Sequence, residues 1–304
     1  MGIEQLLEFH QACREEAAQR YKELLIPRLE GPAWHGEIAD AVREVEATLS
    51  ASDNLKNVDH ALELSGSHMY ILRFLMAPPF SQDQFKIACP SWVKATEKTG
   101  KPLTAKAASS VAAVFGEWAD EERVEPIMSG DDFDTRGEVI SATAHMMAVE
   151  RYRTNRRMRL AREQEETVAS LLRDLGFRLL QSRLVDQPGA LAQDEYMRAT
   201  QFQTADGSTH EVDVAIGLPR RRILALECKV SNDATNSVKR VNDVLKKAGA
   251  WKRQWGRFVL TGAMLQGVFS PKEPRRLLEE DVSVFWSHRP SDLSDWLITQ
   301  KSSE

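Results

Sequence analysis

Three charged residues interrupt two otherwise apolar segments, and they are the part of the chain best suited to chemistry. Asp213 stands in the segment Val-Asp-Val-Ala-Ile, and Glu227 and Lys229 stand in the segment Leu-Ala-Leu-Glu-Cys-Lys-Val. A charge inside an apolar strand is costly to remove from water unless it is paired or bound to an ion. Two carboxylates beside a lysine are typical of a site that binds a divalent cation. The alternative is a structural salt bridge among the same side chains.

The spacing of these residues makes a geometric prediction. Side chains of a strand alternate between its two faces, so Glu227 and Lys229 share one face. A hairpin that turns about Arg220 places Asp213 opposite Glu227 on that face, with their Cβ atoms about 5 Å apart. Two like charges at this separation repel each other unless a cation lies between them. Oxygen ligands of this kind suit Mg²⁺, and a register slip of one residue would separate them.

The period of the apolar residues changes from helical to strand-like after Gly176. Before that glycine, Ile140–Leu175 is predicted to form one or two helices. Glu165 lies at the edge of the apolar stripe of this segment, from which a carboxylate can reach over a sheet packed against the helix. It is a candidate further ligand of metal or water, with a solvated side chain as the alternative. Strands are predicted over Phe177–Leu184, Tyr196–Thr204, His210–Ile216, Ile223–Val230, Arg257–Met264 and Val282–Trp286.

The first half of the chain is predicted to be helical, because its apolar residues recur at helical spacing. Ser81 and Gln84 have the spacing of a capping box, which predicts a helix that starts near Ser81. The chain therefore divides into a helical region, residues 1–150, and a second region, residues 151–304, which holds the three charged residues. The other helices are predicted over Ile3–Leu29, Gly36–Leu49, Ser67–Met76 and Ala107–Trp118.

Charge divides the chain in the same way. Residues 1–150 carry 14 Lys and Arg against 25 Asp and Glu, whereas residues 151–304 carry 26 against 20. A polyanion such as DNA would be attracted to the second half. Six arginines lie between Arg151 and Arg162, and guanidinium groups suit phosphate oxygens. The alternative is a solvated helix that pairs with the acidic first half.

The segment after Lys229 continues this basic character. A polar loop, Ser231–Asn236, can cap a following helix that carries several lysines and arginines. Asn and Arg side chains are able to read the edges of adenine and guanine. A solvated basic helix is again the alternative. The candidate DNA contacts are Arg153, Arg156, Arg157, Ser231, Asn232, Asn236, Lys239 and Arg240.

The composition excludes several other classes of protein. Hydrophobic residues make up 42% and charged residues 28%, which is usual for a globular protein. No apolar run approaches the roughly 20 residues that span a bilayer, and the N-terminus lacks the pattern of a signal peptide. The cysteines Cys13, Cys89 and Cys228 are too far apart for a disulfide framework or a zinc site. We therefore expect a cytoplasmic protein without a membrane partner.

Asp213, the thirteen residues that follow it, and Glu227-Cys228-Lys229 resemble the bipartite motif of the PD-(D/E)XK nuclease superfamily. Val212 stands where the proline of that motif would be, a departure that many members share. Within the superfamily the chain resembles the XamI-type type II restriction endonucleases. The segments that carry this resemblance are Phe74–Pro90, Arg156–Glu166 and Leu226–Asn232.

The resemblance implies an α/β (α+β) fold of restriction-endonuclease type, in which helices flank a mixed sheet and the N-terminal region is mainly helical. It also implies Mg²⁺-dependent, site-specific hydrolysis of double-stranded DNA that leaves 5′-phosphates. Asp213, Glu227 and the backbone carbonyl of Cys228 would hold Mg²⁺, with Glu165 as a further ligand. Lys229 would orient or activate the attacking water and stabilise the developing negative charge.

The same resemblance implies partners. A homodimer is expected, since paired cuts on a duplex call for two active sites, and a cognate DNA methyltransferase would be the functional partner in a bacterial cytoplasm. Residues 1–150 would supply target recognition or dimer contacts. Two alternatives remain: a repair or modification-dependent nuclease on the same core, and a non-catalytic DNA-binding protein with a vestigial core. The presence of both carboxylates and the lysine argues against the second.

Overall fold

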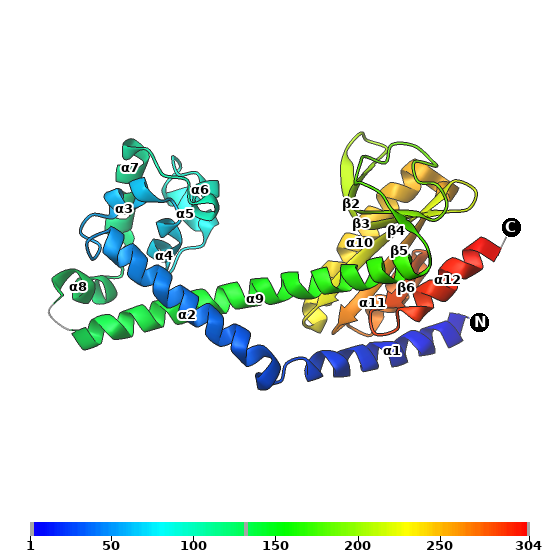
Figure 1. The fold of residues 1–304 in the computed structure, drawn as a ribbon, viewed down its shortest axis with the longest axis horizontal. Helices are drawn as coiled ribbons and strands as arrows, with labels where there is room; N and C mark the ends of the chain where they lie inside the picture. Colours follow the sequence, from blue (N-terminus) through cyan, green and yellow to red (C-terminus); the bar gives the residue numbers. More distant parts are fainter. Residues whose placement is uncertain (1–2, 131–132, 303–304) are drawn as a thin grey trace. The chain divides into compact units, whose positions relative to one another are not determined.

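The computed structural model describes residues 3–130 and 133–302, which form two compact units (Figure 1). One unit joins the described residues up to Ile26 with Arg156–Glu304, and the other consists of Pro27–Asn155. The boundary between the units within the chain lies between Asn155 and Arg156. The N-terminal segment differs from the expectation, because helix α1 (Ile3–Glu23) belongs with the second half of the chain rather than with the helical region.

The described residues of Pro27–Asn155 form helices joined by loops, and they contain no strand. The apolar faces of these helices share one core, which includes Leu62, Met69 and Trp92. Ser81 and Gln84 form the predicted capping box, so the helical prediction for this region is confirmed. The helices are α2 (Pro27–Ala51), α3 (Val58–Leu64), α4 (His68–Phe74), α5 (Gln82–Ala88), α6 (Lys94–Thr99), α7 (Ala105–Trp118), α8 (Glu121–Ser129) and the first part of α9 (Phe133–Asp174).

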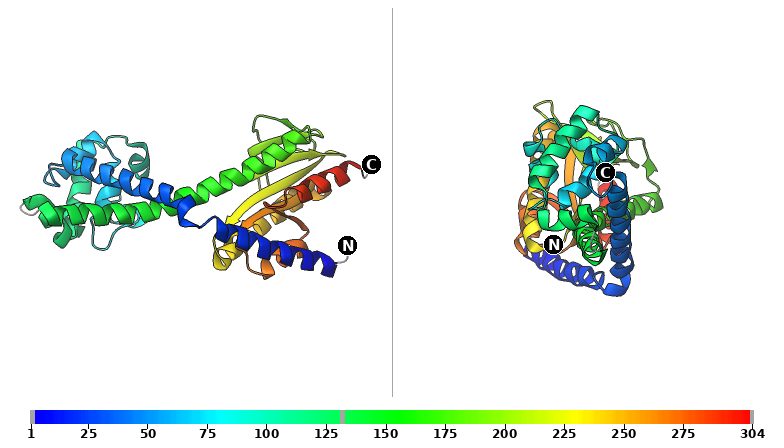
Figure 2. Two further views of the ribbon diagram at one scale, coloured as in Figure 1. Left: turned by 60° about the horizontal axis from the view of Figure 1, so that its bottom comes forward. Right: turned by 90° about the vertical axis from the view of Figure 1, so that its left-hand side faces the viewer.

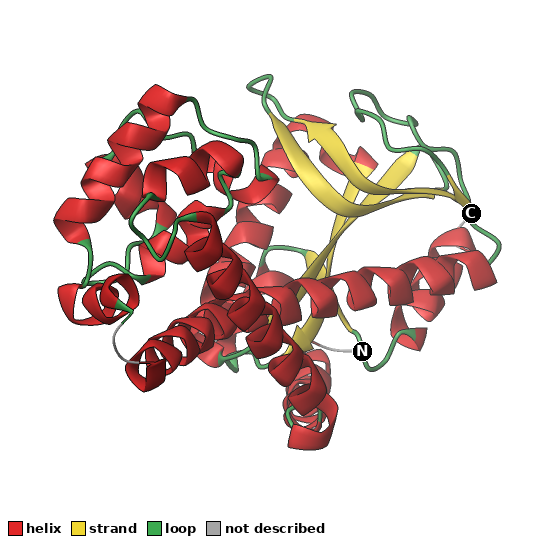
Figure 3. Cartoon of the chain, turned by 60° about the vertical axis from the view of Figure 1, so that its left-hand side comes forward, coloured by secondary structure: helices red, strands yellow, loops and turns green. Residues whose placement is uncertain are grey.

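The other unit is built on a six-stranded mixed sheet in the order β1-β2-β3-β4-β5-β6 (Figure 3). Strands β2, β3 and β4 are antiparallel neighbours, whereas β1 is parallel to β2, and β4, β5 and β6 are parallel. The parallel pairs β4–β5 and β5–β6 require crossover connections, which α10 (Ala234–Trp255) and α11 (Lys272–Glu279) supply. The predicted α/β class is therefore confirmed. The strands are β1 (Arg178–Leu179), β2 (Glu195–Gln203), β3 (Thr209–Leu218), β4 (Arg222–Ser231), β5 (Val259–Gly267) and β6 (Val282–Trp286).

Helices cover both faces of this sheet (Figure 2). The C-terminal part of α9 and helix α12 (Ser291–Ser302) pack on one face, where Leu172 and Leu226 share an apolar cluster. Helices α1, α10 and α11 pack on the other face, where Val244 and Leu265 share a second cluster. Because side chains alternate along β4, Glu227 lies on the α10 face while its neighbour Leu226 lies on the α9 face.

Several elements differ from their predicted extents. The helix expected over residues 3–29 is two helices, because α2 restarts at Pro27, whose fixed φ and missing N–H suit the first position of a helix. The strand expected over residues 177–184 is limited to β1. The rest of that segment is fastened to β2 by other contacts, such as the hydrogen bond from Ser182 Oγ to the carbonyl of Ala199 at 3.0 Å. The segment expected to form one or two helices over residues 140–175 lies in the single helix α9, which ends at Asp174.

No helix in the described parts of the chain is both long enough and apolar enough to cross a membrane.

Candidate active site

Strands β3 and β4 separate at the candidate site. They pair as far as Val214 opposite Leu226, in the register expected for a turn centred on Arg220. Beyond this pair β3 continues beside β2, and β4 continues beside β5. Asp213 and Glu227 are the next positions along the two separating strands, so the predicted register is confirmed.

The pairing of β2 with β3 is distorted at Asp213. Ala199 faces Asp213 in the register of the two strands, but it is absent from the ladder and has a φ of +46°, a conformation that is rare for residues other than glycine. The two neighbours of Asp213 pack on different sides. Val214 joins the apolar cluster under α9, whereas Val212 joins the cluster around Trp251 of α10. A local distortion of this kind re-aims a side chain, and here it lies opposite Asp213.

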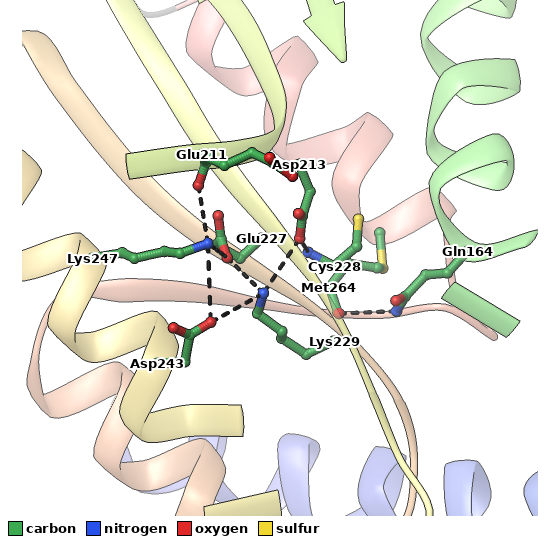
Figure 4. A network of polar contacts seen from close by, with 9 residues as sticks. All are labelled: Gln164, Glu211, Asp213, Glu227, Cys228, Lys229, Asp243, Lys247 and Met264. Carbon is green, nitrogen blue, oxygen red and sulfur yellow. Dashed lines mark hydrogen bonds and ion pairs between the residues drawn. The ribbon is translucent and has the colours of Figure 1, made fainter. Parts of the chain in front are cut away.

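The carboxylate of Asp213 crosses the gap between the two strands (Figure 4). Its Oδ2 accepts a hydrogen bond from the backbone N–H of Cys228 at 2.6 Å and lies 3.5 Å from Lys229 Nζ. Lys229 Nζ in turn lies 2.6 Å from Glu227 Oε2. The structure therefore brings together the two carboxylates and the lysine that the sequence singled out.

Burial and charge act in opposite directions on these groups. Glu227 is fully buried, and burial followed by the charge of Asp213 raises the pKa of Glu227, while Lys229 and Lys247 oppose the rise. Burial would lower the pKa of Lys229, but the charges of Glu227 and Asp213 outweigh it and raise that pKa. Lys229 is therefore held as a cation. Burial raises the pKa of the Cys228 thiol well above its usual value, which makes it unsuited to act as a nucleophile.

Two further residues of the site come from α10 and were not predicted. Lys247 Nζ lies 2.8 Å from Glu227 Oε2 and donates to the backbone carbonyl of Glu211 on β3 at 2.9 Å. Asp243 Oδ2 lies 3.4 Å from Lys229 Nζ and 3.9 Å from Lys247 Nζ. Lys247 thus connects α10 with both separating strands. Figure 4 shows these side chains converging between β3, β4 and α10.

A signal for these two residues exists in the sequence. A helix between two parallel strands packs back onto the sheet, and the buried stripe of α10 includes Val241, Val244 and Ala248. Asp243 and Lys247 are four residues apart and each directly precedes a member of that stripe, so both lie at its edge. The face of the sheet that they meet could not be read from the helix alone.

The donor groups at the gap fit a divalent cation. Glu227 Oε1 is buried and accepts no hydrogen bond from a described residue, and a buried polar atom of that kind calls for an explanation such as an ion. The N–H of Cys228 points toward Asp213, and the carbonyl of a strand residue points to the same side as its N–H. That carbonyl is thus available beside the two carboxylates. Within the described residues, however, no three His, Cys, Asp or Glu side chains gather closely enough to hold a metal by themselves.

Comparison with known proteins identifies the family. The sequence matches the model of the XamI restriction endonuclease family over residues 53–286, which includes the whole candidate site. The chain belongs to this family. The resemblance inferred from the separate sequence segments is thereby confirmed.

Two individual proteins were also found to be similar. The type II restriction enzyme XamI of Xanthomonas campestris pv. amaranthicola is 31% identical over 194 residues, an alignment that covers 61% of this chain and 66% of that enzyme. The match thus spans slightly less than two thirds of the relative's length. Protein VC1899 of Vibrio cholerae has a TM-score of 0.32 and 9% identity, over 87% of this chain and 57% of that chain, which is too low to bear on fold or function.

Glu165 of this XamI-family chain lies near the site without joining the group of Asp213, Glu227 and Lys229. Its side chain is 28% exposed, and one carboxylate oxygen lies 3.6 Å from an Nη atom of Arg198 on β2. Burial, followed by the negative charge of Asp213, raises the pKa of Glu165. Its role as a further ligand stays a prediction.

Two of the candidate DNA contacts are buried in the structure, which corrects the expectation that they face DNA. Arg156 is 7% exposed because its guanidinium packs over the ring of Tyr21 from α1, 4.8 Å from the ring centre, and donates to its hydroxyl. Ser231 is 1% exposed, and its hydroxyl donates to the carbonyl of Asp233 at 2.8 Å. Both residues therefore serve packing and local backbone structure.

The remaining candidates are accessible to solvent. Asn232 is exposed, although its Oδ1 accepts a hydrogen bond from Tyr21 Oη at 2.7 Å. The side chain of Asn236 donates to Asp233, the N-cap residue of α10. The exposed candidates are Arg153, Arg157, Asn232, Asn236 and Lys239, and Arg240 is partly exposed.

Proposed function

We propose that this chain is a type II restriction endonuclease, which hydrolyses phosphodiester bonds of double-stranded DNA at specific sites with the help of Mg²⁺ and leaves 5′-phosphates. The observation that carries the proposal is the meeting of Asp213, Glu227 and Lys229 where β3 and β4 separate. Membership of the XamI restriction endonuclease family supports the same conclusion.

Different residues of the site would perform different steps of the chemistry. Asp213, Glu227 and the carbonyl of Cys228 would hold Mg²⁺, and Glu165 is a candidate fourth ligand. When bound there, Mg²⁺ would lower the pKa of a water molecule and neutralise charge on the phosphate. Lys229, held as a cation by its neighbours, would donate a hydrogen bond to the attacking water or to the negative charge that develops on phosphate oxygen.

Groups of the chain itself hold both carboxylates. The N–H of Cys228 fixes the oxygen of Asp213 that faces β4, and Lys247 fixes one oxygen of Glu227. This leaves Glu227 Oε1 without a hydrogen-bond donor among the described residues. Donors that are already oriented cost little reorganisation when the reaction begins.

The substrate and partners follow from the same proposal. The exposed cations of α9 and α10, including Arg157 and Lys239, would contact DNA phosphates. The helical unit, Pro27–Asn155, would serve target recognition or dimer contacts, and two copies would cut the two strands as a homodimer. A cognate DNA methyltransferase would protect the host genome in a bacterial cytoplasm.

Digestion of a mapped, unmethylated DNA in the presence of Mg²⁺ tests the proposal. We expect discrete fragments from the wild type and none from Lys229→Ala or Asp213→Ala, both of which should still bind DNA. Lys272→Ala is a control, because Lys272 is an exposed cation at the start of α11. Discrete fragments that persist in both site variants would exclude the catalytic assignment.

Two further results would change the substrate or the activity that we assign to this chain. Cleavage of modified or damaged duplexes alone would indicate a modification-dependent or repair nuclease on the same core. Binding to DNA without metal-dependent cleavage of any duplex would indicate a non-catalytic DNA-binding protein.

A further inference from the structure

A cationic cleft lies beside the candidate active site, between α10 and the turn that joins β2 to β3. Its volume is about 330 Å³. Lys246 and Arg253 of α10 line one wall, and His210 of β3 lines the other together with the turn residues. Neither Lys246 nor Arg253 forms an ion pair with any residue that the structure describes. The cleft therefore presents two cations that are not engaged in ion pairs with described residues.

The turn contributes one opposing charge, which is already well satisfied. Asp206 Oδ1 accepts hydrogen bonds from Thr204 Oγ1 at 2.6 Å and from the backbone N–H and hydroxyl of Ser208 at 3.1 Å and 2.7 Å. The Thr204 and Ser208 donors lower the pKa of Asp206, so its carboxylate stays ionised. Among the residues that line the cleft it is the only acid. Lys246 and Arg253 therefore leave the cleft positive and suited to an anion.

Each wall of the cleft contains a residue that is adjacent in sequence to a residue of the candidate active site. Lys246 precedes Lys247, whose ammonium group contacts the catalytic cluster and the carbonyl of Glu211. His210 precedes Glu211 on the other wall. Arg253 lies six residues beyond Lys247, which is about 9 Å along the helix axis at a rise of 1.5 Å per residue. That distance corresponds to about three nucleotides of B-form DNA.

We propose that this cleft binds a backbone phosphate of the DNA duplex, a few nucleotides from the phosphodiester that the site hydrolyses. The inference rests on the proposed function and adds a subsite to it. The guanidinium of Arg253 suits two phosphate oxygens at once, and the ammonium of Lys246 adds a point charge. Phosphates carry no sequence information, so this contact strengthens binding and holds the duplex in register without selecting a sequence.

The salt dependence of DNA binding tests this subsite. The full chain and a Lys246→Ala/Arg253→Ala variant are titrated with a fluorescent duplex in the absence of divalent cations, at several salt concentrations. The logarithm of the binding constant falls with the logarithm of salt by about 0.9 for each phosphate neutralised. We expect the slope of the variant to be shallower by about 1 to 2, whereas Lys272→Ala keeps the wild-type slope. A variant slope equal to that of the wild type overturns the inference.

A second arm separates a DNA phosphate from a free anion. Neutral methylphosphonate linkages are introduced one at a time around the mapped cut, and we expect one position, about two to four nucleotides away, to weaken binding of the wild type but not of the variant. Inorganic phosphate that stabilises the wild type against heat but not the variant, with no such position on DNA, would assign the cleft to a free anion and overturn the inference.

The two proposals can fail separately. A wild type that binds DNA with the expected slope but never cuts refutes the proposed function alone. A wild type that cuts, together with a variant that binds like it, refutes this inference alone. Equal melting temperatures of the wild type and the variant show that the double substitution leaves the fold intact.

Discussion

Removal of the Lys247 ammonium group should destabilise the unit that contains the sheet. Glu227 is fully buried, and Lys247 is one of two cations on its Oε2, at 2.8 Å. Loss of one partner of a buried ion pair costs about 3–5 kcal/mol when the other charge is left alone. Glu227 keeps Lys229 at 2.6 Å, so the loss should be closer to that of one charged hydrogen bond. We therefore expect Lys247→Met to lower the free energy of unfolding by about 1.5–3 kcal/mol.

Urea denaturation followed by tryptophan fluorescence measures this loss. Lys246→Met is the matched control, because the neighbouring lysine is exposed and forms no ion pair with a described residue; it should change stability by less than about 0.5 kcal/mol. In a Glu227→Gln background the buried charge is absent, so Lys247→Met should cost at least about 1 kcal/mol less than in the wild type. The reasoning is refuted if Lys247→Met costs no more than Lys246→Met, or if its cost is the same in both backgrounds.

Three further predictions concern other parts of the chain. Burial lowers the pKa of His10 to about 4, and Trp286 Nε1 donates a hydrogen bond to His10 Nδ1 at 3.2 Å. The unfolded state therefore binds more protons than the folded state between about pH 6.5 and pH 4. Stability should fall as the pH falls through this range, by at most about 3 kcal/mol, and urea titrations of His10→Asn should lack this component. Ala199→Val should lower the free energy of unfolding by about 1–3 kcal/mol and reduce DNA cleavage, because a β-branched residue disfavours a φ of +46°. Ala199→Gly should retain both stability and cleavage. Equal activity of the two variants would exclude a role for the distortion at Ala199. Arg73→Met should destabilise the helical unit by about 3–5 kcal/mol, since it leaves Glu97 buried without its partner at 2.7 Å. Adding Glu97→Leu should restore much of that stability in the same denaturation assay, and no recovery would contradict the explanation.

Much of the sheet could be predicted because a strand is indicated by a pattern of residues within its own segment. The alternation of apolar residues on either side of Arg220 predicted two strands and their register, and the structure has that register. The turn is tight because Arg220 and Arg221 both have positive φ, at 60° and 59°. Asp213 and Glu227 could be paired from sequence for this reason, since a hairpin of known centre leaves one position opposite another.

Residues outside the hairpin were harder to place, because their surroundings depend on packing between distant elements. Arg156 has the positive charge expected of a DNA contact, but the ring of Tyr21 from the N-terminal helix α1 covers it. The N-terminal helix has no local signal for the sheet, yet Cys13 packs in the cluster that includes Leu265 of β5. Neither contact follows from a periodicity, because a periodicity defines an apolar face but not the element that the face will meet.

The sequence by itself determined the two strands, their register, the three charged residues of the site and the family to which the chain belongs. These properties depend on alternation and on short spacing within one hairpin, which the chain encodes locally. The tertiary structure alone decided that Lys247 of α10 reaches Glu227 and that the ladder is distorted at Ala199, opposite Asp213. Those contacts form when a crossover helix and a neighbouring strand pack onto the hairpin. A buried carboxylate can form ion pairs only with the cations that this packing brings to it.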